Sequence, residues 1–345
     1  MRKLRSFQLG DTGEAHRYHV VSRIVGRELL LGEREKEYFR KLLDKQMRFS
    51  GLRALAWCFM GNHFHLLLEV PDKETALQGW TEDDFISRLE ILADETSTFM
   101  TLNEIAMFRE NGYDEGITAI AESVRARLFD LSAFVKELKQ KFTVWFNRRH
   151  DRVGTLWEGR FKSVLLGGTD AIRMVATYID LNPVRAGLAE DPKDYRWCSY
   201  AAAVAGDKGA RLGLASAIGA GKTETWRKVA GEYRRLLFGR GEEKPGGATS
   251  DGLEKRRPGF SREEIQAVWK DGGRLPLAAV LRCRVRYFTD GVVLGSEEFL
   301  EDFFEKRREH FGPKRKRGAR KMRRADWGNV NVLRDLRVRP VEVPQ

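Results

Sequence analysis

At 345 residues, the chain is long enough to bury a sizeable hydrophobic core and to form two domains. Its hydrophobic content of 42% excludes an intrinsically disordered protein. The chain has 62 Lys and Arg against 50 Asp and Glu, a net charge of +12 that favours a polyanionic partner, nucleic acid before an anionic membrane surface.

The cysteines and the N-terminal segment indicate a reducing compartment. Cys58, Cys198 and Cys283 are odd in number and lack CxxC spacing, which excludes a disulfide framework and a cysteine zinc site. The first 30 residues are charged without an apolar signal segment, and no apolar run approaches the length of about 18 residues that crosses a membrane. We therefore expect a cytoplasmic protein with no membrane partner.

The N-terminal segments predict the order strand, helix, strand, strand. Residues 18–25 are rich in β-branched side chains and predict a strand, and residues 33–50 carry apolar side chains at helical spacing. Residues 52–60 and 63–70 predict two more strands, joined by a tight Gly-Asn turn. This order predicts an α+β fold with helices on one face of a sheet.

The middle of the chain begins with residues 72–130, which are acidic and helical in pattern and look like an insertion. A strongly periodic helix with a basic end follows from Leu131, and a strand is expected in the second half of GTLWEGRFKSVLL. Thr169-Asp170 is the expected N-cap of a helix over residues 171–182.

The last third of the chain is basic and less regular. The expected elements are a helix over residues 224–237, a Gly-rich linker over 238–260, a helix capped by Ser261 and Glu264, a hairpin of strands 282–288 and 292–294, and a helix from Glu297. Residues 314–324 then carry eight basic side chains in eleven positions.

His63 and His65 form the first candidate site. Residues i and i+2 of a strand point to one face, so both imidazoles project together, while Phe64 lies on the other face, which we expect to be the buried one. Two adjacent imidazoles are natural ligands of one metal ion. The alternative is an ordinary pair of histidines, because HxH is common by chance.

Tyr178 and Asn182 form the second candidate site. Their i, i+4 spacing places them on one face of a helix, where a single site can use both. The alternative is a packing role, which is usual for a tyrosine in an apolar helix.

The motifs NHFHLLLEV, GTLWEGRFKS and YIDLNPVRAGL, in this order, resemble those of the single-tyrosine HUH transposases, most closely the REP-associated tyrosine transposases of bacteria. The resemblance covers residues of about 15–72 and 130–202, including YRWCSY at 195–200. It implies a ferredoxin-like antiparallel sheet with helices on one face, to which this chain adds a helical insertion and a small basic C-terminal α+β module. The expected domains are a catalytic domain over residues 1–205 with the insertion at about 72–130, a helix and linker over 206–260, and an accessory DNA-binding module over 261–345.

The resemblance also implies a chemistry. It implies that Tyr178 is the nucleophile, that His63 and His65 bind a divalent metal ion, and that Asn182 is the third ligand. Relatives cut single-stranded DNA beside hairpin ends and leave a 5′-phosphotyrosine. The implied cofactor is Mg²⁺ or Mn²⁺, and imidazole ligands suit Mn²⁺ better. The expected protein is a bacterial transposase, cytoplasmic and bound to the nucleoid through DNA, active as a monomer or homodimer.

Basic residues near aromatic ones are the expected DNA contacts. Trp145, Phe146, Trp157 and Phe161 alternate with basic side chains, a pattern that suits phosphate contacts and base stacking. The alternative is that the aromatics are core residues and the charges are merely solvated. The residues expected to bind DNA are Arg148, Arg149, Arg160, Lys162, Arg185, Arg282, Arg284, Arg286, Lys314, Arg315, Lys316 and Arg317.

The sequence leaves two other functions open. A domesticated protein would bind repeat hairpins without cutting them, and a phosphodiesterase would use water in place of Tyr178. The basic C-terminal run is either part of the DNA-binding module or only a solubilising tail. The GAGKT sequence at residues 219–223 does not indicate nucleotide binding, because no strand precedes it and Ser216 stands where a phosphate-binding loop needs glycine.

Overall fold

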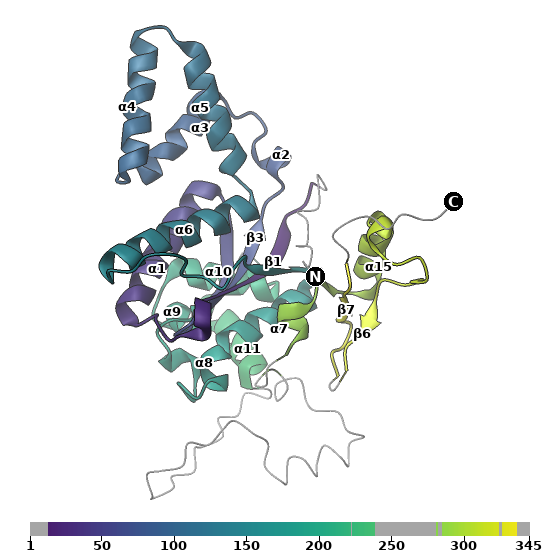
Figure 1. Cartoon of the computed structure of the whole chain (residues 1–345). Helices are drawn as coiled ribbons and strands as arrows, with labels where there is room; N and C mark the ends of the chain where they lie inside the picture. Colours follow the sequence, from purple (N-terminus) through teal and green to yellow (C-terminus); the bar gives the residue numbers. More distant parts are fainter. Residues whose placement is uncertain (1–12, 222, 239–280, 282–284, 324–325, 337–345) are drawn as a thin grey trace, which may run out of the picture.

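The computed structural model describes residues 13–221, 223–238, 281, 285–323 and 326–336. Its centre is one sheet with the strand order β2-β3-β1-β4-β5-β7-β6 (Figure 1). The strands are β1 His16–Arg23, β2 Arg53–Phe59, β3 His63–Val70, β4 Lys162–Leu166, β5 Val293–Gly295, β6 Arg320–Lys321 and β7 Asn331–Leu333.

The first four strands form a ferredoxin-like unit, as predicted. Helix α1 (Glu33–Ser50) connects β1 to β2, and α6 (Leu131–Arg149) precedes β4. Neighbours in the order β2-β3-β1-β4 are antiparallel, which is the arrangement of a βαββαβ fold. Both helices pack on one face of the sheet, where Phe39 and Phe142 join Phe64 in one buried cluster. The apolar residues that recur at helical spacing in α1 and α6 therefore pack against the alternate residues of β3 that point to this face.

Helices also cover the second face of the sheet, beyond the one-sided cover that was expected. Here Leu67 of β3 and Val164 of β4 pack with Val175 and with Leu214. Because this second layer exists, β3 is covered on both faces, and all of its residues except His63 are buried. The helices of this layer are α7 Thr169–Asp180, α8 Asn182–Arg185, α9 Ser199–Val204, α10 Lys208–Ile218 and α11 Trp226–Phe238.

The start of α7 differs from the prediction. The helix begins at Thr169, and its N-cap is Gly168, with no side-chain cap hydrogen bond. Gly168 has φ of 83°, a left-handed conformation that favours glycine, so the chain turns from β4 into α7 before Thr169 can act as a cap. Asp170 instead lies in the first turn, where its negative charge interacts favourably with the positive end of the helix dipole.

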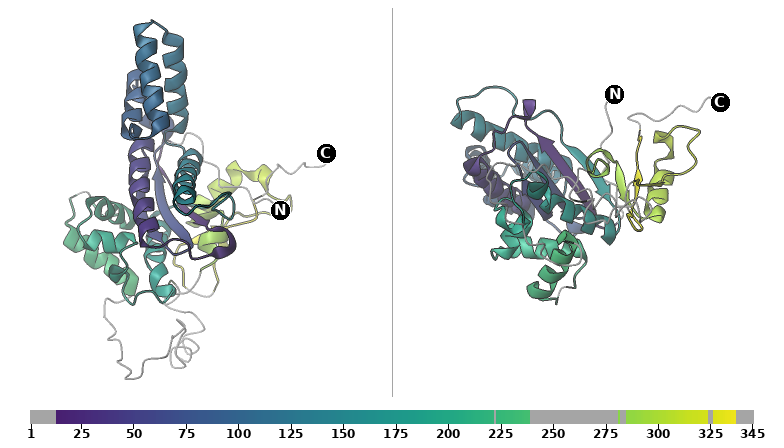
Figure 2. Two further views of the ribbon diagram at one scale, coloured as in Figure 1. Left: turned by 60° about the vertical axis from the view of Figure 1, so that its left-hand side comes forward. Right: turned by 90° about the horizontal axis from the view of Figure 1, so that it is seen from below.

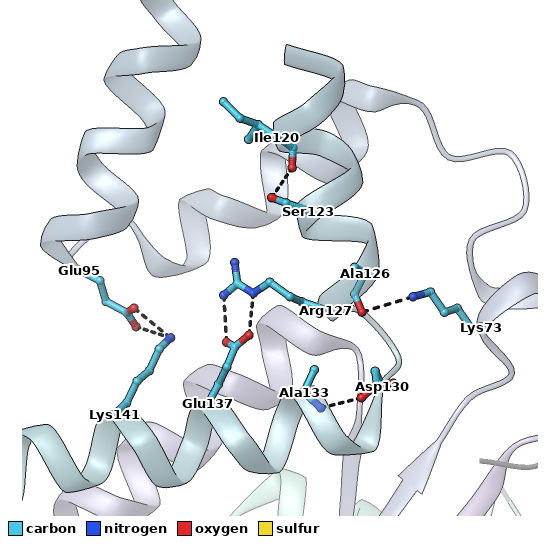
Figure 3. A network of polar contacts seen from close by, with 10 residues as sticks. All are labelled: Lys73, Glu95, Ile120, Ser123, Ala126, Arg127, Asp130, Ala133, Glu137 and Lys141. Carbon is cyan, nitrogen blue, oxygen red and sulfur yellow. Dashed lines mark hydrogen bonds and ion pairs between the residues drawn. The ribbon is translucent and has the colours of Figure 1, made fainter. Parts of the chain in front are cut away.

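The predicted insertion is helical and forms an arm that extends away from the sheet (Figures 1 and 2). Leu92, Ile105 and Val124 belong to a hydrophobic cluster of the arm that is separate from the two clusters of the sheet. At its base, Arg127 binds Glu137 of α6 with two hydrogen bonds of 2.7 and 2.9 Å (Figure 3). The helices are α2 Lys73–Ala76, α3 Glu82–Leu89, α4 Thr96–Glu110 and α5 Asp114–Arg127.

The C-terminal residues extend the same sheet. β5 lies parallel beside β4, and β7 and β6 follow it. The predicted hairpin is wrong where the chain is described, because Tyr287–Asp290 forms the short helix α14, and Asp290 ends this helix where a hairpin turn was expected. Val293–Gly295 is fully buried and finds its partners at the open edge of β4 and in β7, so a local hairpin partner is not needed. Helix α15 spans Glu297–Lys306, as predicted.

Several expected features fall outside the described residues. These are the capping box of Ser261 and Glu264 and nearly all of the expected linker. None of the described helices is both long and apolar enough to cross a membrane.

Candidate active site

Two adjacent strands place three histidines on one face of the sheet. In the pairing of β1 with β3, Val21 lies opposite His65 and His19 lies opposite Leu67, so the odd-numbered residues of both strands share a face. The rings of His63 and His65 have centroids 5.1 Å apart, and those of His19 and His65 are also 5.1 Å apart. Sequence analysis identified His63 and His65 but missed His19, because nothing in the local sequence reveals the strand pairing.

Helix α7 packs on this same face and brings Tyr178 to the histidines. The centroid of its ring lies 6.1 Å from that of His65 and 6.3 Å from that of His19, edge-on to both. The structure therefore unites a tyrosine and a histidine pair that are more than a hundred positions apart in the sequence.

The histidine face is buried, in contrast to the expectation that only the face of Phe64 would be. His65 is 3% exposed and His19 is fully buried. His63, at the start of β3, is only partly buried. The cause is the second helical layer, which the pattern of β3 alone does not predict. A ligand from solvent therefore meets His63 before it meets His65.

Hydrogen bonds fix the three imidazoles. His63 Nδ1 lies 2.6 Å from Asn62 Oδ1, and the amide nitrogen of Asn62 donates to the carbonyl of Arg27 at 2.8 Å. The amide orientation of Asn62 is thereby set, and its oxygen faces His63 as an acceptor. On the other side, His65 Nδ1 lies 2.9 Å from His19 Nε2, and His19 Nδ1 lies 2.7 Å from the carbonyl oxygen of Phe288.

Both buried histidines are neutral at pH 7. Burial lowers the pKa of His19 to about 4, an effect that the bond to the Phe288 carbonyl partly offsets and the charge of Arg185 reinforces. Burial also lowers the pKa of His65 well below its ordinary value, with further lowering from His19 and His63. The neutral imidazole is the form that binds a metal ion.

Tyr178 is covered on two sides. The guanidinium carbon of Arg185 lies 3.8 Å from the ring centroid, and the ring of Phe288 in α14 meets it edge-on at 4.9 Å. Arg185 also donates to the carbonyls of Tyr178 at 2.8 Å and Leu281 at 2.7 Å. Tyr178 is only 3% exposed as a result. Arg185, an expected DNA contact, is in this structure part of the packing around the tyrosine.

Asn182 is buried at the end of α7. Its amide nitrogen donates to the carbonyls of Ile179 at 3.0 Å and Tyr178 at 3.4 Å, so this side chain caps the helix. Its oxygen, the atom that a metal ion would use, takes no part in these two bonds. Within the described residues, no group of three or more His, Cys, Asp and Glu has the arrangement of a metal site.

The basic residues expected to contact DNA fall into two groups. Most are exposed, namely Arg148, Arg149, Arg160, Lys162, Arg286, Lys314, Lys316 and Arg317. Lys162 pairs with Asp290 of α14 at 3.1 Å. Arg315 instead donates to the carbonyls of Arg317 and Gly318 and lies over the ring of Phe311, so it holds its own loop together. Arg282 and Arg284 lie outside the described residues.

The aromatic residues near Arg148 and Arg160 belong to the core. Phe146, Trp157 and Phe161 are at most 6% exposed. Trp145 is half-buried, and its ring stacks on Tyr38 with 4.0 Å between centroids. For Phe146, Trp157 and Phe161 the structure therefore supports the alternative, that the aromatic side chains are core residues.

The chain is similar in structure to solved structures of known proteins. No model of a protein family matches the chain, and no curated protein matches it. One similar solved structure is described as a REP-associated tyrosine transposase bound to a REP hairpin. The two chains share 17% identity with a TM-score of 0.37, and the match covers 60% of this chain and 87% of that one.

Proposed function

We propose that the chain is a metal-dependent tyrosine transposase that cuts and rejoins single-stranded DNA beside hairpin ends. The observation that carries this proposal is the meeting of Tyr178 with His65, 6.1 Å between ring centroids, on the face that also carries His63. These residues come from separate motifs, and the resemblance of the motifs to those of HUH transposases gives the same assignment. The proposed setting is the bacterial cytoplasm, with a monomer or homodimer bound to DNA.

We propose that His63, His65 and Asn182 would hold a divalent metal ion. His63 donates from Nδ1 to Asn62, so its lone pair is on Nε2, and His65 is neutral because of its burial. Together with the oxygen of Asn182 they would supply two nitrogen ligands and one oxygen ligand, a set that suits Mn²⁺ better than Mg²⁺. When bound, the ion acts as a Lewis acid on the scissile phosphate and orients it.

Tyr178 supplies the nucleophile. Its phenol oxygen attacks phosphorus, the bond from phosphorus to the 3′-oxygen breaks, and a 5′-phosphotyrosine forms while the phenol proton passes to solvent. The released 3′-oxygen takes up a proton and becomes a hydroxyl. Reversal of this step with another 3′-hydroxyl rejoins DNA without a nucleotide cofactor, because the phosphotyrosine conserves the bond.

Access to Tyr178 depends on the segment that covers it. At 3% exposure the ring cannot meet a phosphate group while Phe288 and Arg185 lie against it. The proposed reaction therefore includes a movement of these side chains when DNA binds. Lys162 is well placed to respond, because its partner Asp290 is in the covering helix and a DNA phosphate would compete for the same ammonium group.

The test is a covalent adduct. Protein, Mn²⁺ and end-labelled DNA with a hairpin are mixed, and the products are separated under denaturing conditions. The proposal predicts a labelled protein band that disappears in Tyr178→Phe. Tyr113→Phe is the matched control, because Tyr113 is an exposed tyrosine in the distant arm and should leave the band unchanged.

A hairpin-binding protein without cleavage is the second candidate. The burial of Tyr178 favours it. Tight hairpin binding with no adduct under Mg²⁺ or Mn²⁺ would establish it. Cleavage that persists in Tyr178→Phe would instead identify a phosphodiesterase that uses water.

A further inference from the structure

The hydrogen-bond chain from Phe288 through His19 to His65 joins the C-terminal part of the molecule to the proposed metal site. Its first link is the carbonyl of Phe288, which lies 2.7 Å from His19 Nδ1. A carbonyl oxygen only accepts hydrogen bonds, so His19 Nδ1 carries the proton and donates it. His19 is fully buried, and the partners of its two ring nitrogens are a carbonyl and an imidazole, so no carboxylate compensates a positive charge on this ring. Its Nε2 therefore carries a lone pair.

The second link follows from the first. His65 Nδ1 lies 2.9 Å from His19 Nε2, and two facing lone pairs would repel at this distance. His65 Nδ1 therefore carries the proton and donates it to His19. The lone pair of His65 is consequently on Nε2, the same nitrogen that carries it in His63.

We infer that His19 is a positioning residue that fixes the tautomer and ring orientation of His65, with the Nε2 lone pair available to a ligand. The inference rests on the proposed function for its consequence, because a metal ion on His63 and His65 needs both lone pairs on its side. Outer hydrogen bonds of this kind hold ligating histidines in other metal sites, and their removal weakens metal binding by about 10- to 100-fold.

The burial of His19 supports a positioning role over a ligand role. His19 is 0% exposed, and both of its ring nitrogens are engaged, one by Phe288 and one by His65. No nitrogen of His19 is left to bind a metal ion while this chain of bonds persists. A histidine that filled space alone would not need two polar partners in a core where apolar side chains of the same volume are cheaper to bury.

Two substitutions whose side chains differ in length distinguish a positioning role of His19 from a role that only fills space. In His19→Gln the amide oxygen takes the place of Nε2 and still accepts from His65, whereas in His19→Asn the shorter amide takes the place of Nδ1 and reaches only Phe288. His16→Gln is the control, because His16 is on the same strand at an even-numbered position and therefore on the opposite face. All variants are made in the full chain, and thermal unfolding shows that each is folded.

The readout is ¹⁵N NMR of the imidazoles in protein without metal, followed by titration with Mn²⁺. The expected result is protonated Nδ1 for His65 in the wild-type protein, the His16→Gln control and His19→Gln, and loss of this single tautomer in His19→Asn. We expect Mn²⁺ to bind about 10- to 100-fold more weakly to His19→Asn than to His19→Gln.

Two results would overturn the inference. One is a wild-type His65 with its proton on Nε2, which needs no variant to be measured. The other is a His65 tautomer and Mn²⁺ affinity that are the same in His19→Asn and His19→Gln. If the tautomer depends on residue 19 but Mn²⁺ binds to none of the proteins, the positioning role holds and the metal part of the proposed function fails.

Discussion

Asp180 lies two residues after the proposed nucleophile, at the C-terminal end of α7, and connects this helix to its neighbours. Its carboxylate is fully buried and accepts hydrogen bonds from Ser199 Oγ at 2.7 Å, the backbone of Tyr200 at 3.0 Å and Tyr233 Oη at 2.7 Å. One side chain thus ties α7 to α9 and α11. Burial raises the pKa of Asp180 to about 6, although the three hydrogen bonds act in the opposite direction.

This raised pKa predicts a dependence of stability on pH. The unfolded chain releases the Asp180 proton near 3.8 and the native state near 6, so the native state is favoured at low pH and loses this advantage as the pH rises through 6. Between pH 4 and pH 7 the free energy of unfolding should fall by about 2 kcal/mol more in the wild-type protein than in Asp180→Asn. Denaturant unfolding of both proteins at the two pH values measures this difference, and an equal change in both would contradict it.

At the scale of the residue, sequence patterns identify part of the site. Spacing and motif order predict Tyr178, His63 and His65, because those signals are local or belong to the motifs. His19 and Asp180 were not predicted, because their roles come from a strand register and from helices that meet only in the folded chain. A histidine within the β-branched strand β1 was the available signal for His19, since a polar side chain in such a strand needs a partner.

At the scale of the element, the arm of α3, α4 and α5 has its own hydrophobic cluster. Ile105 of α4 is 3% exposed within it, whereas Met107 of the same helix is 51% exposed. Two ion pairs tie the base of the arm to α6, namely Arg127 with Glu137 and Lys141 with Glu95 (Figure 3). A unit of this kind can open locally while the rest of the protein stays folded.

Ile105→Ala should therefore loosen the arm alone. Removal of this buried side chain costs about 2–5 kcal/mol, which hydrogen exchange would show as faster exchange in α3, α4 and α5. Exchange in β1 and β3, and formation of the DNA adduct, should stay unchanged. Met107→Ala is the matched control on the exposed side of the same helix. Equal acceleration in the arm and the sheet would mean that the arm and the sheet unfold together.

Sequence patterns predicted whether most segments are helices or strands, but they did not predict which strands pair with each other. The helical insertion and the strands of the ferredoxin-like unit follow from periodicity, which is a local property. The parallel pairing of β5 with β4 does not, because the strands are over a hundred residues apart and β5 has only three residues. The hairpin expected at residues 282–294 failed for this reason: nearby turn residues suggested a local partner, and the buried edge of β4 supplied a distant one.

At the scale of the whole molecule, the C-terminal part completes the sheet and covers the tyrosine. Phe288, Val293 and Leu294 are fully buried against the rest of the chain. A protein shortened to residues 1–238 lacks these side chains. It should therefore lose the stabilisation from their burial, about 1.5–3 kcal/mol for each, and expose the edge of β4. We expect a lower melting temperature and self-association in size-exclusion chromatography. A shortened protein that is monomeric and as stable as the full chain would show that the shared sheet adds no stability.

The central claim is that Tyr178 becomes covalently joined to DNA. The most direct measurement is mass spectrometry of protein that has reacted with hairpin DNA and Mn²⁺ and has then been digested with a protease and a nuclease. The account predicts a nucleotide on the peptide that contains Tyr178, attached through a 5′-phosphate. A nucleotide on another tyrosine, such as Tyr195 or Tyr200, or an unmodified Tyr178 peptide after the DNA has been cut, would contradict it.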